Sequence, residues 1–86
     1  MYRIEISKPA AREIRNLPKT VVARILPAIL ALADDPRPAG GKKLSGSREN
    51  LWRIRVGDYR VIYLVNDTIQ LIDVRKAGHR KNIYRR

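Results

Sequence analysis

Three arginines alternate with apolar residues in the segment 51–63, at positions Arg53, Arg55 and Arg60. Gly57-Asp58 divides this segment into two alternating halves, which is typical of a β-hairpin closed by a two-residue type II′ turn. Pairing outward from that turn sets Arg55 opposite Arg60, and Arg53 lies two residues along on the same face. Like charges opposite one another destabilise paired strands. The pattern therefore predicts that an anion binds this face.

Arginine suits the recognition of a phosphate, because its planar guanidinium group donates to two oxygens at once and stays charged. It is a poor general base, since its pKa lies above about 12. Structural alternatives stay open for all three positions. Arg60 falls opposite Asp73 of the next expected strand, in a surface ion pair worth only about 0.2–1 kcal/mol. Arg53 and Arg55 could simply keep an exposed strand soluble.

The C-terminal segment contains two more side chains that could act on a nucleotide. His79 is the only histidine of the chain, and its ordinary pKa near ~6.5 allows it to accept or donate a proton at neutral pH. The ring of Tyr84 could stack on a base, a contact worth about 1–3 kcal/mol. Two structural interpretations stay open, an exposed histidine in a basic tail and a hydrophobic anchor that Tyr84 forms with Ile83.

The chain is short, basic and free of cysteine. Its 86 residues with a net charge of +11 predict one domain over residues 1–86. Residues 37–86 carry thirteen basic and four acidic side chains, against six and four in residues 1–36. The C-terminal half is therefore expected to bind a polyanion, with nucleic acid as the first candidate and an acidic protein as the second.

The same composition bears on cofactors and compartment. With one histidine, no cysteine and scattered carboxylates, we expect neither a metal site nor a bound cofactor. A small domain without cysteine fits a reducing cytoplasm. No apolar run approaches the length of a membrane span, so no membrane association is expected.

The positions of apolar and turn residues predict an α+β fold. An N-terminal strand precedes a two-helix hairpin, and a three-stranded antiparallel meander then forms a small sheet that packs on the helices, followed by a short basic tail. Ser7 is the expected N-cap of the first helix, and Asn66-Asp67 is expected to form a second tight turn. The expected ranges are 2–7 for the first strand, about 8–17 and 18–33 for the helices, and 51–56, 59–65 and 68–75 for the meander.

Alternation assigns the two faces of the meander. One face is the expected core, formed by Trp52, Ile54, Val56, Tyr59, Val61, Tyr63, Ile72 and Val74. The other face is polar at one end and apolar at the other, with Arg53, Arg55, Arg60, Asp73 and Arg75 beside Ile62, Leu64, Ile69 and Leu71. Because an apolar patch of this kind is rarely left bare, we expect the C-terminal segment or a protein partner to cover it.

Three segments of the chain, 52–63, 42–46 and 78–85, resemble the RelE/ParE toxin superfamily and its RelE branch in particular. The similarity spans the whole chain. It implies a RelE-like fold and a toxin of a type II toxin–antitoxin module. Such toxins are ribosome-dependent endoribonucleases, which cut mRNA in the ribosomal A site by attack of a 2′-OH on the adjacent phosphate, without metal. The implied partners are mRNA, rRNA and a RelB-like antitoxin, acidic and encoded adjacently. The free toxin is expected to be a monomer that forms a hetero-oligomer with the antitoxin.

The resemblance also implies roles for single residues. Arg53 and Arg55 match two basic positions that are often lysines in RelE toxins, and Arg60 matches an arginine that grips the scissile phosphate. Tyr84 matches a tyrosine that stacks on the nucleotide or orients it, and His79 is the candidate for proton transfer. The expected contacts to RNA and the ribosome come from Lys42, Lys43, Arg75, Lys76, Arg80 and Lys81.

Two other functions fit the same residues. A ParE-like toxin that inhibits DNA gyrase would share the fold without the nuclease chemistry. A non-catalytic nucleic-acid-binding module would bind RNA or DNA with strong salt dependence and without cleavage. The mRNA-cleaving toxin is the leading hypothesis, because the arginine cluster, His79 and Tyr84 together favour cleavage.

Overall fold

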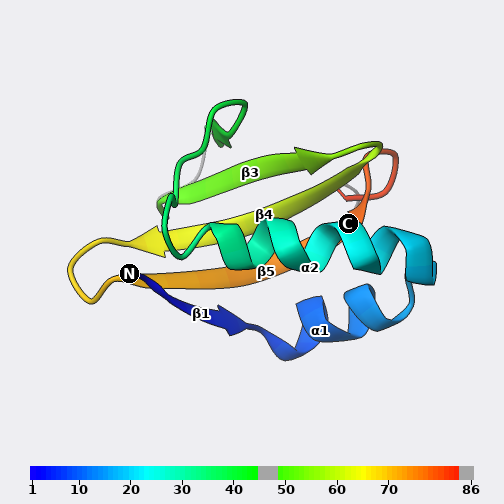
Figure 1. The fold of residues 1–86 in the computed structure, drawn as a ribbon, viewed down its shortest axis with the longest axis horizontal. Helices are drawn as coiled ribbons and strands as arrows, with labels where there is room; N and C mark the ends of the chain where they lie inside the picture. Colours follow the sequence, from blue (N-terminus) through cyan, green and yellow to red (C-terminus); the bar gives the residue numbers. More distant parts are fainter. Residues whose placement is uncertain (45–48, 84–86) are drawn as a thin grey trace.

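The structure, a computed structural model, describes residues 1–44 and 49–83. Two helices pack on a five-stranded mixed sheet, which agrees with the predicted α+β class (Figure 1). The elements follow in the order β1 (Arg3–Ile6), α1 (Lys8–Arg15), α2 (Lys19–Ala31), β2 (Lys42–Lys43), β3 (Leu51–Val56), β4 (Tyr59–Asn66) and β5 (Leu71–His79).

The helices begin and end close to the positions that the sequence predicts. Ser7 is the N-cap of α1, and its hydroxyl oxygen accepts a hydrogen bond from the Ala10 N–H at 3.2 Å, which satisfies one of the free donors of the first turn. Ala10 and Ile14 are buried on the inner side of α1. In α2, Ile25 and Ile29 are buried against the sheet. Each helix is held to the sheet by the apolar side chains of one of its sides.

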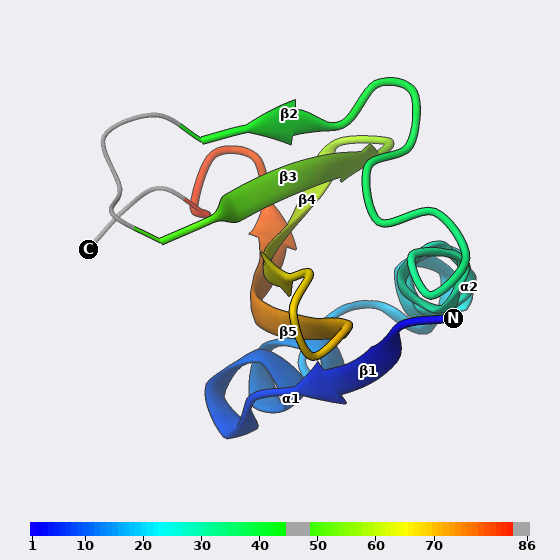
Figure 2. The same cartoon turned by 90° about the vertical axis from the view of Figure 1, so that its left-hand side faces the viewer.

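The strand order is β1-β5-β4-β3-β2. The β3–β4 hairpin has the predicted register, with Val56 opposite Tyr59 and Arg55 opposite Arg60. Gly57 has a φ of +62°, as the first central position of a type II′ turn requires. β1 pairs with β5 in parallel, and β2, a strand that the prediction lacks, pairs with β3. β2 and α1 lie at opposite ends of the molecule (Figure 2).

The predicted tight turn at Asn66-Asp67 is wrong, and so is the pairing that followed from it. Four residues, 67–70, connect Asn66 to Leu71. The Asn66 side-chain oxygen accepts from the backbone N–H groups of residues 68 and 69 at 3.1 and 3.2 Å, and Gln70 has a φ of +54°. The longer turn and an irregularity between Ile62 and Tyr63 place Gly78 opposite Arg60.

Asp73 therefore pairs with Leu64, four residues from its predicted partner Arg60. The expected ion pair between Arg60 and Asp73 does not form. Near the turn, the observed pairing differs from the predicted pairing by an even number of residues. Because side chains alternate between the two faces of a strand, Ile72 and Val74 keep their predicted face.

The predicted core face is confirmed. Six of its residues belong to the buried core with the inner sides of both helices, and Trp52 and Tyr59 pack partly buried against it. The six are Ile54, Val56, Val61, Tyr63, Ile72 and Val74.

The C-terminal segment covers one end of the opposite face. Ile62 and Ile83 are buried but lie outside the main core. The Ile83 Cδ1 atom lies 3.6 Å from the position that a Cβ at Gly78 would take. Ile69 remains 58% exposed, so the apolar patch is covered only in part.

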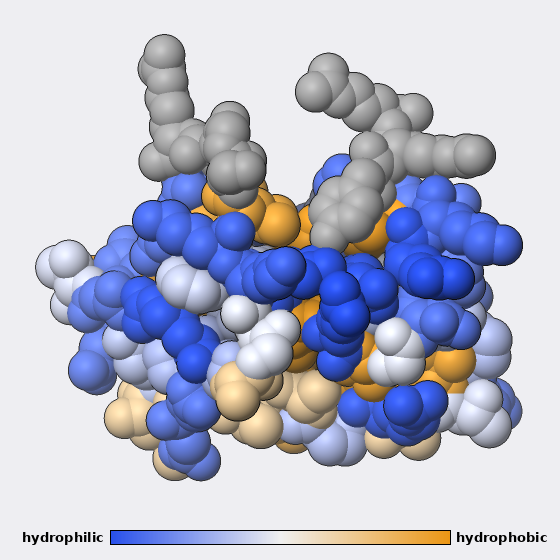
Figure 3. Space-filling view, turned by 90° about the horizontal axis from the view of Figure 1, so that it is seen from above, coloured by the Kyte–Doolittle hydropathy of each residue, from blue (hydrophilic) through white to orange (hydrophobic). Residues whose placement is uncertain are grey.

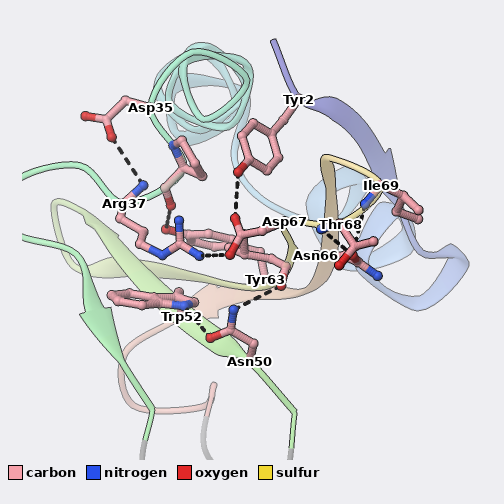
Figure 4. Close-up of polar contacts among 12 residues, drawn as sticks. Tyr2, Asp35, Arg37, Asn50, Trp52, Tyr63, Asn66, Asp67, Thr68 and Ile69 are labelled. Atoms are coloured by element: carbon pink, nitrogen blue, oxygen red, sulfur yellow. Dashed lines mark hydrogen bonds and ion pairs between the residues drawn. The ribbon is translucent and has the colours of Figure 1, made fainter.

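A polar network fastens the loop after α2 to the sheet (Figure 4). The Tyr2 hydroxyl and the Arg37 Nη2 donate to the two carboxylate oxygens of Asp67 at 2.6 and 2.7 Å. These bonds hold the pKa of Asp67 below its ordinary value, with the Tyr2 bond as the larger cause. The Tyr63 hydroxyl donates to the Pro36 carbonyl at 2.7 Å, and burial raises the pKa of Tyr63 to about 12.

In the described part of the chain, no helix has the length and apolar character needed to cross a membrane.

Candidate functional site

Four basic residues lie on the sheet face that points away from the helices. Across β3, β4 and β5, Arg53 aligns with Ile62 and Lys76, while Arg55 aligns with Arg60 and Gly78. Paired residues of neighbouring strands point to the same face, so the register places Arg53, Arg55, Arg60 and Lys76 together. We call this set the arginine face. Figure 3, which looks down on the molecule from above, shows hydrophilic side chains with hydrophobic patches between them along the side of β2 and β3.

Arg60 is held rigidly although it is charged. It is the only buried charged residue within 1–44 and 49–83, with 8% of its surface exposed. Its Nη1 donates to the carbonyls of Gly57 and Tyr59, both at 3.1 Å. Its Nε and Nη2 donate no hydrogen bond to the residues that the structure describes. The hairpin turn therefore orients the guanidinium group and leaves donors for a ligand.

Arg53 and Arg55 are not neutralised by carboxylates. No ion pair within the described ranges includes either of them. The Arg53 Nε is buried without a hydrogen-bond partner, which is costly unless a ligand supplies an acceptor. Lys42 pairs with Arg53 across β2 and β3, so it extends the positive charge to the sheet edge, while Lys43 pairs with Trp52 and follows the core face.

Two further arginines each lie next to a residue of the hairpin turn. The Arg80 N–H donates to the Asp58 carbonyl at 2.8 Å, and its Nε lies 3.9 Å from the Asp58 carboxylate. Arg24 of α2 lies over Gly57, with its Nη1 3.2 Å from the position that a Cβ there would take. Arg24 was not predicted from the sequence as a site residue. It is the one charged residue of α2 after Lys19, and that isolation was the available signal.

Arg75 has a different environment from the arginine face. Its Nε donates to Asp73 at 2.8 Å and its Nη2 to Glu49 at 3.0 Å. These bonds raise the pKa of Arg75, the bond to Asp73 most. Two carboxylates neutralise this guanidinium, so Arg75, a residue expected to bind RNA, has little free charge to offer.

The structure does not bring His79 to the arginine face. His79 pairs with Tyr59, and their rings meet edge to face at 5.3 Å between centroids. The His79 Nδ1 accepts from the Lys81 N–H at 3.1 Å. His79 therefore lies on the helix side of the sheet, half-buried. Tyr84 lies outside the described residues.

The arrangement can bind a phosphate and stabilise negative charge on its oxygens, because three arginines share one face of the sheet and form no ion pair with a described carboxylate. It lacks a group that takes up a proton near neutral pH, since arginine stays charged. Across residues 1–44 and 49–83, potential metal ligands do not gather in groups of three or more.

Comparisons with known proteins agree with this fold. The profile of the ParE toxin family of type II toxin–antitoxin systems, parDE, matches residues 4–84. Toxin RelE of Mycobacterium tuberculosis is 31% identical over 85 residues, 98% of this chain and 87% of the relative. A chain of the RelE–RelB complex from Pyrococcus horikoshii OT3 has a TM-score of 0.81 and 35% identity, covering 94% of this chain and 97% of that chain. For the intact E. coli RelBE toxin–antitoxin complex the TM-score is 0.79 and the identity 26%, covering 92% and 96%.

Proposed function

This chain belongs to the RelE/ParE superfamily of toxins of type II toxin–antitoxin systems, and we propose that it is a ribosome-dependent endoribonuclease that cuts mRNA in the A site. One observation carries the proposal. Arg60 is oriented by its own hairpin turn beside Arg53 and Arg55, and no described carboxylate pairs with any of the three. Such a cluster is suited to the scissile phosphate of an RNA strand.

The reaction is attack of a ribose 2′-OH on the adjacent phosphorus, with departure of the 5′-oxygen and formation of a cyclic phosphate. Arg60 donates from Nε and Nη2 to the phosphate oxygens as their negative charge grows. Arg53 and Arg55 neutralise the same phosphate and its neighbour along the strand. These contacts orient the nucleotide and stabilise the transition state.

The two proton transfers require groups other than these arginines. In the proposal Tyr84 stacks on the nucleotide or orients it. His79 faces Tyr59 in this structure, so its proposed role as an acid depends on movement of the C-terminal segment when RNA binds. Lys42, Lys76, Arg80 and Lys81 supply contacts to RNA phosphates.

A cognate antitoxin completes the proposal. The solved relatives from P. horikoshii and E. coli are complexes of RelE with RelB. A chain with a net charge of +11 suits an acidic RelB-like partner encoded adjacently. The free toxin is then a cytoplasmic monomer, and the antitoxin complex is a hetero-oligomer.

Primer extension on an mRNA in a reconstituted translation reaction tests this function. We expect the wild-type chain to cut within ribosome-bound codons and Arg60→Ala to lose the cuts. Arg12→Ala is the matched control, because Arg12 is an exposed arginine of α1 remote from the hairpin. Equal cutting by Arg60→Ala would contradict the role of Arg60.

The family profile gives one reason to keep a second function in view, because it describes a ParE toxin. A ParE-like toxin inhibits DNA gyrase by protein contact. The same preparations are therefore assayed for supercoiling by gyrase. Intact mRNA together with inhibited supercoiling would replace the nuclease proposal with this one.

A further inference from the structure

The chain folds back after β5 onto a single residue, His79. The backbone N–H groups of Asn82 and Ile83 donate to the His79 carbonyl at 2.8 and 3.0 Å, and the Lys81 N–H donates to the Nδ1 of its ring at 3.1 Å. We call residues 79–83 the C-terminal turn, which Figure 1 shows in red beside the turn of the β3–β4 hairpin. Three consecutive backbone donors therefore depend on His79, and one of them depends on its side chain.

The bond from Lys81 fixes the protonation state of the His79 ring. An imidazole nitrogen accepts a hydrogen bond only when it carries no proton, so the ring is neutral and its proton lies on Nε2. A proton added to Nδ1 turns this acceptor into a donor, which then faces the donating N–H of Lys81. The bond is lost and two donors oppose one another. The observed geometry of the C-terminal turn is therefore compatible only with a neutral ring.

The ring is accessible to a proton from water. His79 is half-buried and lines a cavity of about 440 Å³ between the end of α1, β5 and the C-terminal turn. Glu13 is the only acidic residue among the described lining residues, and its Oε1 accepts from the Ala77 N–H at 3.0 Å.

The charged and titratable groups near the ring come from every element packed around it. They are Glu13 of α1, Tyr59 of β4, Lys76 of β5, Asp58 of the hairpin turn, and Arg80 and Lys81 of the C-terminal turn itself. Among these side-chain types and histidine, only histidine ordinarily titrates between about pH 5 and pH 8. A change of the C-terminal turn within that range therefore points to His79.

We propose that His79 is a pH-sensitive switch, whose neutral ring holds residues 81–83 and whose protonated ring releases them. The proton binds the open form and is excluded from the closed form, so acid favours opening. The Arg80 N–H donates to the Asp58 carbonyl at 2.8 Å. These backbone groups do not titrate, so release begins after Arg80.

The switch goes beyond the proposed function and does not depend on it. If the chain cuts RNA, release supplies the movement of the C-terminal segment that the proposed role of His79 as an acid requires.

NMR spectroscopy of the full chain at pH 7.5 and pH 5.5 tests the switch. Long-range proton–nitrogen spectra should show the His79 Nδ1 without a proton at pH 7.5. Hydrogen exchange of the amides of residues 81–83, corrected for the intrinsic rate at each pH, should show a loss of protection of about 10-fold in acid. The amides of β4 should keep their protection, which shows that the change is local.

Two variants of His79 separate the proton from the side chain. His79→Asn is the matched control, because an asparagine side-chain oxygen accepts from the backbone N–H two residues on and does not titrate. We expect its protection to be equal at both pH values. His79→Phe keeps an aromatic ring against Tyr59 but has no acceptor, so residues 81–83 should have low protection at both pH values.

Four results would overturn the switch. They are a proton on Nδ1 at pH 7.5, equal protection of wild type at both pH values, undiminished protection in His79→Phe, and the same loss in acid for wild type and His79→Asn. The last result would show that another group takes up the proton. Because these experiments contain no RNA, their failure leaves the nuclease proposal standing, and a chain that cuts no mRNA leaves the switch standing.

Discussion

At the scale of single residues, the candidate site depends on which charges the fold leaves unpaired. Arg60 and Arg75 are both partly shielded arginines on the same sheet, yet their partners differ. Backbone carbonyls of the hairpin turn hold Arg60, whereas Asp73 and Glu49 neutralise Arg75. A carbonyl orients a guanidinium group without cancelling its charge. The same residue type is therefore assigned to phosphate binding at position 60 and to structure at position 75.

Tyr63 gives a prediction for alkaline pH. Its phenol is buried, it donates to the Pro36 carbonyl at 2.7 Å, and its pKa rises from 10.0 to about 12. The folded pKa exceeds the unfolded one, so this contribution to the free energy of unfolding is complete below pH 10 and is lost as the pH rises towards 12. Tyr63→Phe should be less stable than wild type by about 1 kcal/mol at neutral pH.

The difference between the two proteins should shrink above pH 10 and then reverse, because only wild type must bury a phenol that ionises. Urea unfolding from pH 7 to pH 11.5 measures this difference. If the free energy of unfolding changed with pH in the same way for both proteins, the assignment of the raised pKa to Tyr63 would be contradicted.

At the scale of elements, the hairpin could be predicted and its neighbours could not. Gly57 permits the positive φ that a two-residue turn requires, and alternation on either side then fixes the register. The β4–β5 turn lacks such a signal, because Gln70 takes a positive φ without being glycine and Asn66 closes a longer loop with its side chain. β2 consists of two lysines, too few for a periodic pattern. The sequence therefore predicted that the three arginines share one face of the sheet, but it could not predict the position of His79.

Gly57 also provides a test of the hairpin turn. Alanine at this position must take a positive φ and approach the Arg24 guanidinium at 3.2–3.3 Å. We expect Gly57→Ala to destabilise the fold by about 1–2 kcal/mol from the backbone alone, with a further cost from Arg24. Gly40→Ala is the matched control, since Gly40 has a φ of +88° and open space where the Cβ would be. Thermal unfolding measures the stability of both variants. A smaller loss of stability for Gly57→Ala than for Gly40→Ala would contradict the close packing of Arg24.

At the scale of the whole molecule, the two faces of the sheet have different roles. The helices pack on one face of the sheet and form the core with it, and the arginine face is the opposite one. Arg53 and Arg55 also line a groove between α2, the loop after it and β3.

The contrast between unpaired and neutralised arginines predicts how RNA binding responds to salt. Each phosphate neutralised on a single strand contributes about −0.7 to the slope of log K against log salt. Arg55→Gln should therefore make the slope shallower by about 0.7 for a short single-stranded RNA. Arg75→Gln should leave the slope unchanged, because Asp73 and Glu49 already neutralise Arg75. Fluorescence anisotropy between 50 and 300 mM salt measures both slopes, and a larger change for Arg75→Gln would reverse the assignment.

The central claim is that the arginine face stabilises attack of a 2′-OH on the adjacent phosphate of ribosome-bound mRNA. Its most direct test is single-turnover cleavage of two mRNAs that differ only in one 2′-deoxy nucleotide, placed on the 5′ side of the cut. We expect rapid cleavage of the all-ribose mRNA, ending in a cyclic phosphate and a 5′-OH, and no cleavage at the deoxy position. Equal cleavage of both mRNAs would contradict it.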